Sequence, residues 1–173
     1  MGTNLSAPIM FANIEVSHPL ENEPELARLI GCISGHSSLI STTMVGIFGL
    51  TNNDLETQKY ARAPAKKKRQ QLKKCVQESS VERYFCDQIK ACLDEVITPL
   101  ETKRGRIMHE VWTPDTDKGF KLMDNQILVG KKLSTFSITE ESLSCLLNED
   151  KSANGSLLSF FARFSLALKT GAR

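Results

Sequence analysis

The feature that most constrains the fold is an amphipathic helical pattern in the middle of the chain. Apolar residues recur three or four positions apart over residues 81–96, which places them on one face of an α-helix. Ser79 and Glu82 match a capping box, in which each side chain bonds the backbone N–H of the other residue. The sequence therefore predicts a helix from Ser79 to about Pro99, with a buried face formed by Val81, Phe85, Ile89, Leu93 and Val96.

Two helices are predicted before this one. Asn22 is a good N-cap for the first, and Gly35 suits the position just after its last residue. The second begins at Ser37 or Ser38 and reaches about Leu50. It is apolar around most of its circumference, which is typical of a helix in the centre of a core.

The sequence pattern changes after residue 105. Residues 106–112 and residues 126–129 are typical of strands, and residues 114–119 are typical of a turn. The sequence therefore predicts a small β-hairpin. Further on, Thr139 is expected to cap a short helix that ends at Leu147.

The C-terminal part is expected to hold a polar loop and a last helix. Residues 148–155 are polar and contain a glycine, so they are predicted to form the loop. Ser156 can cap a helix that reaches Lys169. The predicted fold is mostly α: a single compact helical domain over residues 21–173 with a small β-hairpin, or α+β as the alternative. Residues 1–20 are predicted to form an extended N-terminal arm.

Composition excludes several classes of protein. With 173 residues, 40% hydrophobic and 24% charged, the chain can bury a core as one domain, so disorder throughout is not expected. No apolar run reaches the length of about 18 residues that a membrane span needs. Five cysteines without CxxC spacing, and no signal-peptide pattern, favour free thiols in an intracellular protein, cytoplasmic or nuclear.

Positive charge is concentrated in one short stretch. The net charge of the chain is +2, but residues 1–58 carry −5, residues 59–74 carry +8 and residues 75–173 carry −1. The stretch contains no acid. Asn53 or Asp54 is predicted to cap a helix that Pro64 interrupts or kinks. A basic helix is predicted over residues 59–78. The bases are Lys59, Arg62, Lys66, Lys67, Lys68, Arg69, Lys73 and Lys74.

The crowding of these bases predicts an anionic partner. Like charges three or four residues apart on a helix repel one another by a few tenths of a kcal/mol per pair, roughly. Ala65, Leu72 and Val76 offer only a narrow apolar seam for docking. The cluster therefore lowers stability unless an anion neutralises it. A solvated surface helix without a partner is the alternative.

Three kinds of partner fit the basic stretch. Phosphate contact with nucleic acid would be largely blind to sequence, because only Tyr60 offers a ring for stacking. Residues 66–69 are similar to a basic nuclear import signal, which an import receptor would bind. An anionic membrane surface is the third, since Gly2 lies in a myristoylation pattern and one acyl chain plus a polybasic patch binds a membrane stably.

The sequence offers no pattern for catalysis. His109 and Glu110 begin like a zinc-protease motif, but position 113 is Thr. Asp115 and Asp117 lack the further ligands of a calcium loop. No phosphate-binding loop or nucleophile elbow is present. The chain is therefore predicted not to be an enzyme and to need no metal or cofactor.

The last predicted helix is unusually apolar for a terminal one. Its large residues either lie in the core or form a face for a second copy of the chain. On the second interpretation the chain is a homo-oligomer that contacts itself through Leu157, Phe160, Phe161 and Phe164.

These features predict a non-enzymatic assembly protein that self-associates and binds nucleic acid or an anionic membrane, of viral matrix or nucleocapsid type. That type is an analogy to a class of function and not to a sequence. One alternative is a nuclear adaptor or RNA-binding module with an import signal. The other is a myristoylated adaptor at the membrane periphery.

Overall fold

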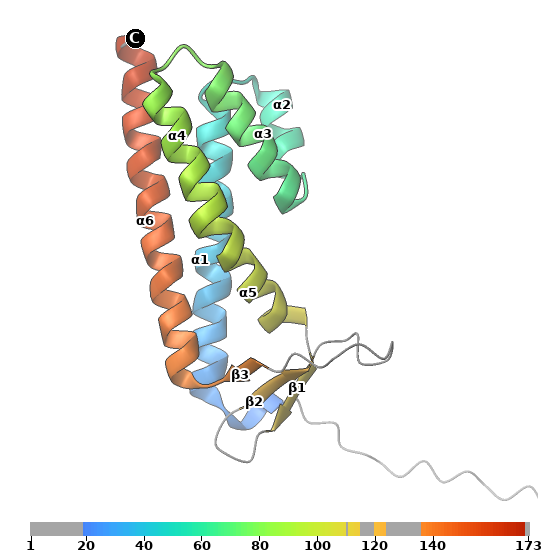
Figure 1. Ribbon diagram of the computed structural model, residues 1–173. Helices are drawn as coiled ribbons and strands as arrows, with labels where there is room; N and C mark the ends of the chain where they lie inside the picture. The colour runs from blue at the N-terminus through green and yellow to red at the C-terminus, as the bar shows by residue number, and fades with distance from the viewer. Residues whose placement is uncertain (1–18, 110, 115–119, 124–135, 172–173) are drawn as a thin grey trace, which may run out of the picture.

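The computed structural model describes residues 19–109, 111–114, 120–123 and 136–171. It confirms a mostly α fold with a single helical domain (Figure 1). Residues 1–18, which make up nearly all of the predicted arm, lie outside the described residues. The elements are η1 (Pro19–Asn22), α1 (Pro24–Gly49), α2 (Asp54–Ala61), α3 (Ala65–Glu78), α4 (Arg83–Ala91), η2 (Cys92–Ile97), α5 (Thr98–His109), β1 (Val111–Pro114), β2 (Phe120–Met123), β3 (Phe136–Ile138) and α6 (Glu140–Thr170).

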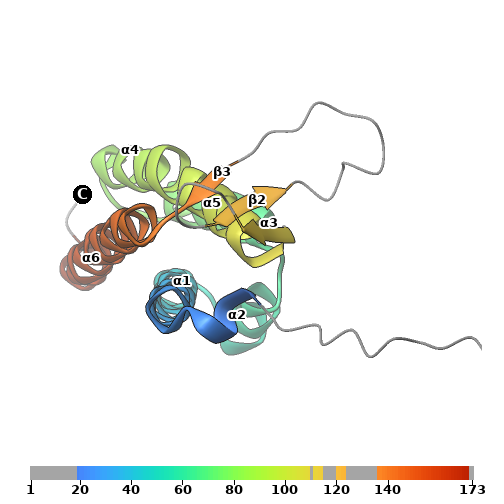
Figure 2. The ribbon, with the colours of Figure 1, turned by 90° about the horizontal axis from the view of Figure 1, so that it is seen from below.

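Two long helices form the spine of the domain. α1 and α6 lie side by side and run in the same direction, away from the small sheet (Figure 1). α4, η2 and α5 follow one another as a rod that runs the opposite way along this pair. Viewed from the sheet end, α1 lies between α6 and α2 (Figure 2).

The two helices predicted over residues 22–50 are one continuous helix, α1. Gly35 was expected to end the first of them, and a glycine inside a helix does cost about 1 kcal/mol relative to alanine. The helix continues because its buried stripe continues: Ile33 and Ile40 lie two turns apart on the same face, both buried. Burial of this stripe against α6 outweighs the local cost of the glycine.

The predicted polar loop at residues 148–155 is also wrong. These residues lie inside α6, which begins at Glu140. The expected cap at Thr139 is present and is completed by the Ser142 side chain. The buried stripe of α6 passes through the polar stretch without a gap, because Asp150 and Asn154 occupy core positions between apolar neighbours. Because Asp150 and Asn154 are polar, the sequence pattern of residues 148–155 is typical of a loop, although both side chains occupy buried positions of the helix.

The helix predicted from Ser79 to Pro99 begins later and ends later. Ser79 does not cap it: the Ser79 Oγ donates to the Val76 carbonyl at the end of α3 (2.5 Å), and α4 begins at Arg83. Pro99 does not end it either. The preceding turn widens into the π-helical segment η2, where the backbone N–H and Oγ1 of Thr98 both bond the Leu93 carbonyl. This wide turn accommodates a proline that lacks an N–H.

A three-stranded antiparallel sheet lies where α1 and α6 begin (Figure 1). Its strand order is β1-β2-β3, with Val111 opposite Met123 and Phe120 opposite Ile138. Of the predicted strands, only residues 111 and 112 among the described residues lie in a strand of this sheet, β1. Residues 106–109 belong to α5, where Ile107 is buried at helical spacing from Leu100. Residues 126–129 lie outside the described residues.

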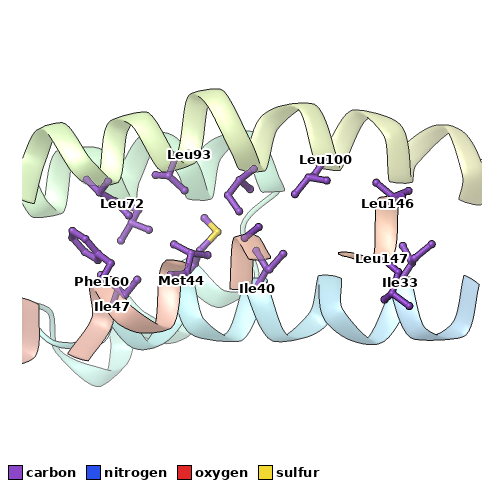
Figure 3. Packing of buried hydrophobic residues seen from close by; sticks show 14 of the residues in the cluster. Ile33, Ile40, Met44, Ile47, Leu72, Leu93, Leu100, Leu146, Leu147 and Phe160 are labelled. Carbon is purple, nitrogen blue, oxygen red and sulfur yellow. The ribbon is translucent and has the colours of Figure 1, made fainter. Parts of the chain in front are cut away.

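The core lies between the spine and the α4–η2–α5 rod (Figure 3). Leu157, Phe160 and Phe164 are buried in it, and the Phe85 ring centroid lies 5.9 Å from those of Phe160 and Phe164. Phe161 is half-buried, and its ring packs against Gly46, where an added Cβ atom would lie 3.6 Å from the ring. The four residues predicted to form a self-association face therefore pack within the chain, because α6 directs its apolar stripe at α1 and α4.

Candidate polyanion-binding site

The basic stretch folds into two helices that meet at a corner. Asn53 caps α2 as predicted, with its side chain accepting from the Glu56 N–H (3.0 Å). α2 ends at Ala61, and Pro64 is the N-cap of α3. A proline has no N–H and disfavours helical backbone in the residue before it, so the helix cannot continue through this point. The single basic helix predicted over residues 59–78 is therefore wrong.

Apolar anchors fix the corner on the domain. The Tyr60 ring stacks on Phe48 of α1 with a centroid distance of 4.1 Å and an interplanar angle of 3°. Of the predicted seam of α3, Leu72 and Val76 are fully buried, whereas Ala65 is exposed. Burial raises the pKa of Tyr60, so this hydroxyl stays neutral. These contacts determine which bases of the corner face the domain and which face solvent.

Three of the eight bases face the domain and hold α3 in place. The Lys68 Nζ donates to the Ser41 Oγ of α1 (3.0 Å). Arg69 forms an ion pair with Glu101 of α5, and Lys73 forms one with Asp94 of η2. Side-chain exposure is 15% for Arg69 and 29% for Lys73. We call Lys68, Arg69 and Lys73 the inward group; each of them joins α3 to a different element.

Four other bases face solvent without a counter-charge. Lys59, Arg62, Lys66 and Lys67 are exposed, and none makes an ion pair or a side-chain hydrogen bond with the residues that the structure describes. We call these four the outward group. The eighth base, Lys74, is exposed and lies 3.6 Å from Glu78. The outward group spans the end of α2 and the first turn of α3.

The backbone adds to the positive charge of the outward group. The first turn of α3 contains Lys66 and Lys67 but no acid, and no side chain caps it. The N–H groups of a first helical turn lack intrahelical partners and carry the positive end of the helix dipole. Glu56 is the one acid beside Lys59 and Lys67 in the shallow hollow between α2 and α3. The corner is thus a cationic surface with little internal neutralisation.

A buried polar cluster was missed by sequence reasoning. The Arg104 Nε of α5 lies 3.5 Å from the Asp150 Oδ1 of α6, and both side chains are almost fully buried. Loss of hydration raises the pKa of Asp150, an effect that Arg104 and His36 oppose, and it lowers the pKa of Arg104. The Asn154 side-chain oxygen lies buried nearby on the same stripe of α6. The available signal was the spacing of positions 150 and 154, which lie at helical intervals from the apolar residues Leu147 and Leu157.

The remaining predicted features do not extend the corner within the described residues. Gly2 lies outside the described residues. Within the described ranges, no three or more metal-ligating side chains gather as a metal site, and no helix has the length and apolarity to cross a bilayer. Searches against protein-family models, curated protein sequences and solved structures find no match to this chain.

Proposed function

We propose that this chain is a non-enzymatic structural protein that binds the phosphate backbone of nucleic acid through the outward group. One observation carries the proposal: four exposed cations lie together at the α2–α3 corner with no counter-charge of their own among the described residues. Like charges held this closely favour the binding of an anion that neutralises them. A chain of phosphates supplies several such charges at once.

The chemistry of the corner favours contact with the backbone over contact with bases. Lys59, Lys66 and Lys67 present flexible ammonium groups that pair with phosphates as point charges, and Arg62 adds one planar guanidinium. The only aromatic residue of the corner, Tyr60, is buried against Phe48 and offers no ring to an unstacked base. Binding is therefore expected to be indifferent to sequence and strongly dependent on salt.

The nuclear-import alternative receives less support. In residues 66–69 only Lys66 and Lys67 face solvent, whereas Lys68 and Arg69 bond to α1 and α5. A receptor that binds all four side chains would have to unfold the first turns of α3.

Self-association through the predicted face of α6 also receives less support, because Leu157, Phe160 and Phe164 are buried in the core of the chain itself.

A salt titration tests the proposal. We would measure binding of the full chain to duplex DNA, single-stranded RNA and vesicles with anionic headgroups between about 50 and about 200 mM salt. If all four outward bases neutralise phosphates, log K against log salt for the duplex should have a slope of about −3.6. Tighter binding to vesicles than to either nucleic acid would make a membrane the partner. No binding to any of the three at the lowest salt would contradict the proposal.

A charge-matched pair of variants separates the corner from the net charge of the protein. The test variant replaces the outward group with glutamine: Lys59→Gln, Arg62→Gln, Lys66→Gln and Lys67→Gln. The control removes the same charge from exposed bases elsewhere: Arg83→Gln, Lys90→Gln, Lys151→Gln and Lys169→Gln. The test variant should lose nearly all of its salt-dependent affinity, whereas the control should keep most of it. Equal losses would mean that net charge, and not the corner, attracts the polyanion.

A further inference from the structure

A cavity lies on the opposite side of α3 from the solvent-facing bases. It has a volume of about 530 Å³ and is lined by residues of α1, α3 and α5. The cations that line it are Lys68, Arg69 and Arg104, and Ser41, Thr98 and Thr102 supply hydroxyl groups. None of the outward group lines it. The cavity is therefore a separate place in the molecule where positive charge gathers.

Two of the cavity cations keep N–H donors that bond no group in the described ranges. Arg69 is neutralised by Glu101, the one carboxylate among the described residues that line the cavity. Within the described part of the chain Lys68 bonds only the neutral Ser41 hydroxyl, which leaves two of its three N–H donors for a ligand. Arg104 is 6% exposed and its Nε lies 3.5 Å from Asp150, but its Nη2 is buried without a hydrogen-bond partner among the described residues. An unused donor on a buried cation is costly, and a bound anion would satisfy it.

The remaining walls suit a ligand that is anionic at one end and apolar at the other. Ala65, the first residue of α3, lines the cavity, and the first turn of this helix contains no acid. Ile40 and Met44 of α1 and Met108 of α5 supply apolar surface. A free phosphate ion would contact the cations but leave this surface wet. A larger ester would cover it.

We infer that this cavity binds a small phosphate monoester, with the phosphate between Lys68 and Arg104 and the esterified group against Ile40 and Met44. The inference goes beyond the proposed function, because the cavity and the outward group share no residue. Both the phosphate and the apolar body should contribute to affinity. Neither the phosphate ion alone nor the apolar group alone should bind as tightly as the ester.

Phenyl phosphate is a suitable probe, with inorganic phosphate and phenol as its two halves. We would titrate each into the full ¹⁵N-labelled chain and follow the amide signals of Ser37, Ser41 and Thr102. Phenyl phosphate should give saturable shifts at these residues and a lower Kd than either half. Adenosine 5′-monophosphate and glycerol 3-phosphate as further ligands distinguish a nucleotide from a lipid headgroup as the source of the ester.

Two neighbouring lysines provide the matched variants. Lys68→Gln should weaken phenyl phosphate binding about tenfold, the effect of one lost charge-assisted hydrogen bond. Lys66→Gln, which removes the same charge two residues away on the solvent side, should leave it unchanged.

Arg104 needs a variant that keeps the fold, because Arg104→Gln alone would leave Asp150 buried and unpaired. The double variant Arg104→Gln/Asp150→Asn removes both charges and should weaken phenyl phosphate binding while the far-ultraviolet circular dichroism stays that of the wild type. The inference is overturned if phenyl phosphate causes no saturable shifts around the cavity. It is also overturned if Lys66→Gln weakens binding as much as Lys68→Gln.

Discussion

The two sides of α3 carry the same kinds of side chain and have different roles. On the inward side, Lys68, Arg69 and Lys73 bond to α1, α5 and η2. On the outward side, Lys66 and Lys67 have no protein partner within the described residues. A cation that is paired inside the molecule contributes to the position of a helix, whereas an unpaired one attracts an external anion. Seven of the eight neighbouring bases thus form two groups with opposite effects on stability, and Lys74, which lies beside Glu78, belongs to neither.

The largest expected effect comes from Arg104 of α5, a buried cation that, like the inward group, is paired inside the molecule. Arg104→Met should lower the free energy of unfolding by about 3 to 5 kcal/mol, because Asp150 is left as an uncompensated charge in the core. Adding Asp150→Leu should restore most of the loss. Urea denaturation of the two variants and the wild type measures this. A double variant no more stable than Arg104→Met would mean that the pair is not what the single substitution disrupts.

The second prediction concerns the outward group, where a charge change should have the opposite effect. Lys66→Glu with Lys67→Glu should weaken binding to duplex DNA by about tenfold or more. The same change should raise the free energy of unfolding by about 0.5 to 1 kcal/mol, because acids in the first turn of α3 match the helix dipole. Fluorescence anisotropy and urea denaturation measure the two effects.

The control for that prediction is Lys90→Glu with Lys151→Glu, which changes the charge equally at two other exposed positions. It should retain most of the affinity for DNA. If Lys66→Glu/Lys67→Glu instead destabilised the fold, these two lysines would belong with the inward group, and the comparison between the two sides of α3 would fail.

A smaller effect should distinguish members of the inward group. Arg69→Gln should lower the free energy of unfolding by about 1 kcal/mol, and Lys73→Gln by less, because the Arg69–Glu101 pair is less exposed to water than the Lys73–Asp94 pair. Lys67→Gln on the outward side is the reference and should cost nothing. Thermal and urea unfolding of the three single variants would show the order. Equal stabilities would contradict a docking role for these ion pairs.

The smallest effect is a dependence on pH. Burial raises the pKa of Asp150 above its ordinary value of 3.8, so the folded state holds this proton more tightly than the unfolded chain. The resulting stabilisation is complete below the ordinary pKa and is lost as the pH rises through the folded-state value. Relative to Asp150→Asn, which does not titrate here, the wild type should therefore lose stability as the pH rises above about 4. A constant difference between the two proteins from acid to neutral pH would contradict the raised pKa.

Sequence reasoning recovered the parts of the molecule that depend on local chemistry. Asn53 and Thr139 cap their helices as predicted. Pro64 interrupts the helix that Asn53 caps, although the basic helix predicted over residues 59–78 ran through it. It failed where tertiary burial outweighed a local signal. Gly35 and Pro99 lie inside helices because the buried stripes of α1 and of the α4–η2–α5 rod continue past them.

The candidate site shows the same division. The sequence alone determined that eight bases lie close together without an acid between them, because charge density follows from composition over a short stretch. Only the tertiary structure decided which of them face the domain. Burial of Tyr60, Leu72 and Val76 fixes the rotation of the corner, and the contact partners Ser41, Glu101 and Asp94 come from segments at least 21 residues away along the chain. Pairings over such separations arise from how helices pack, and no local pattern encodes them.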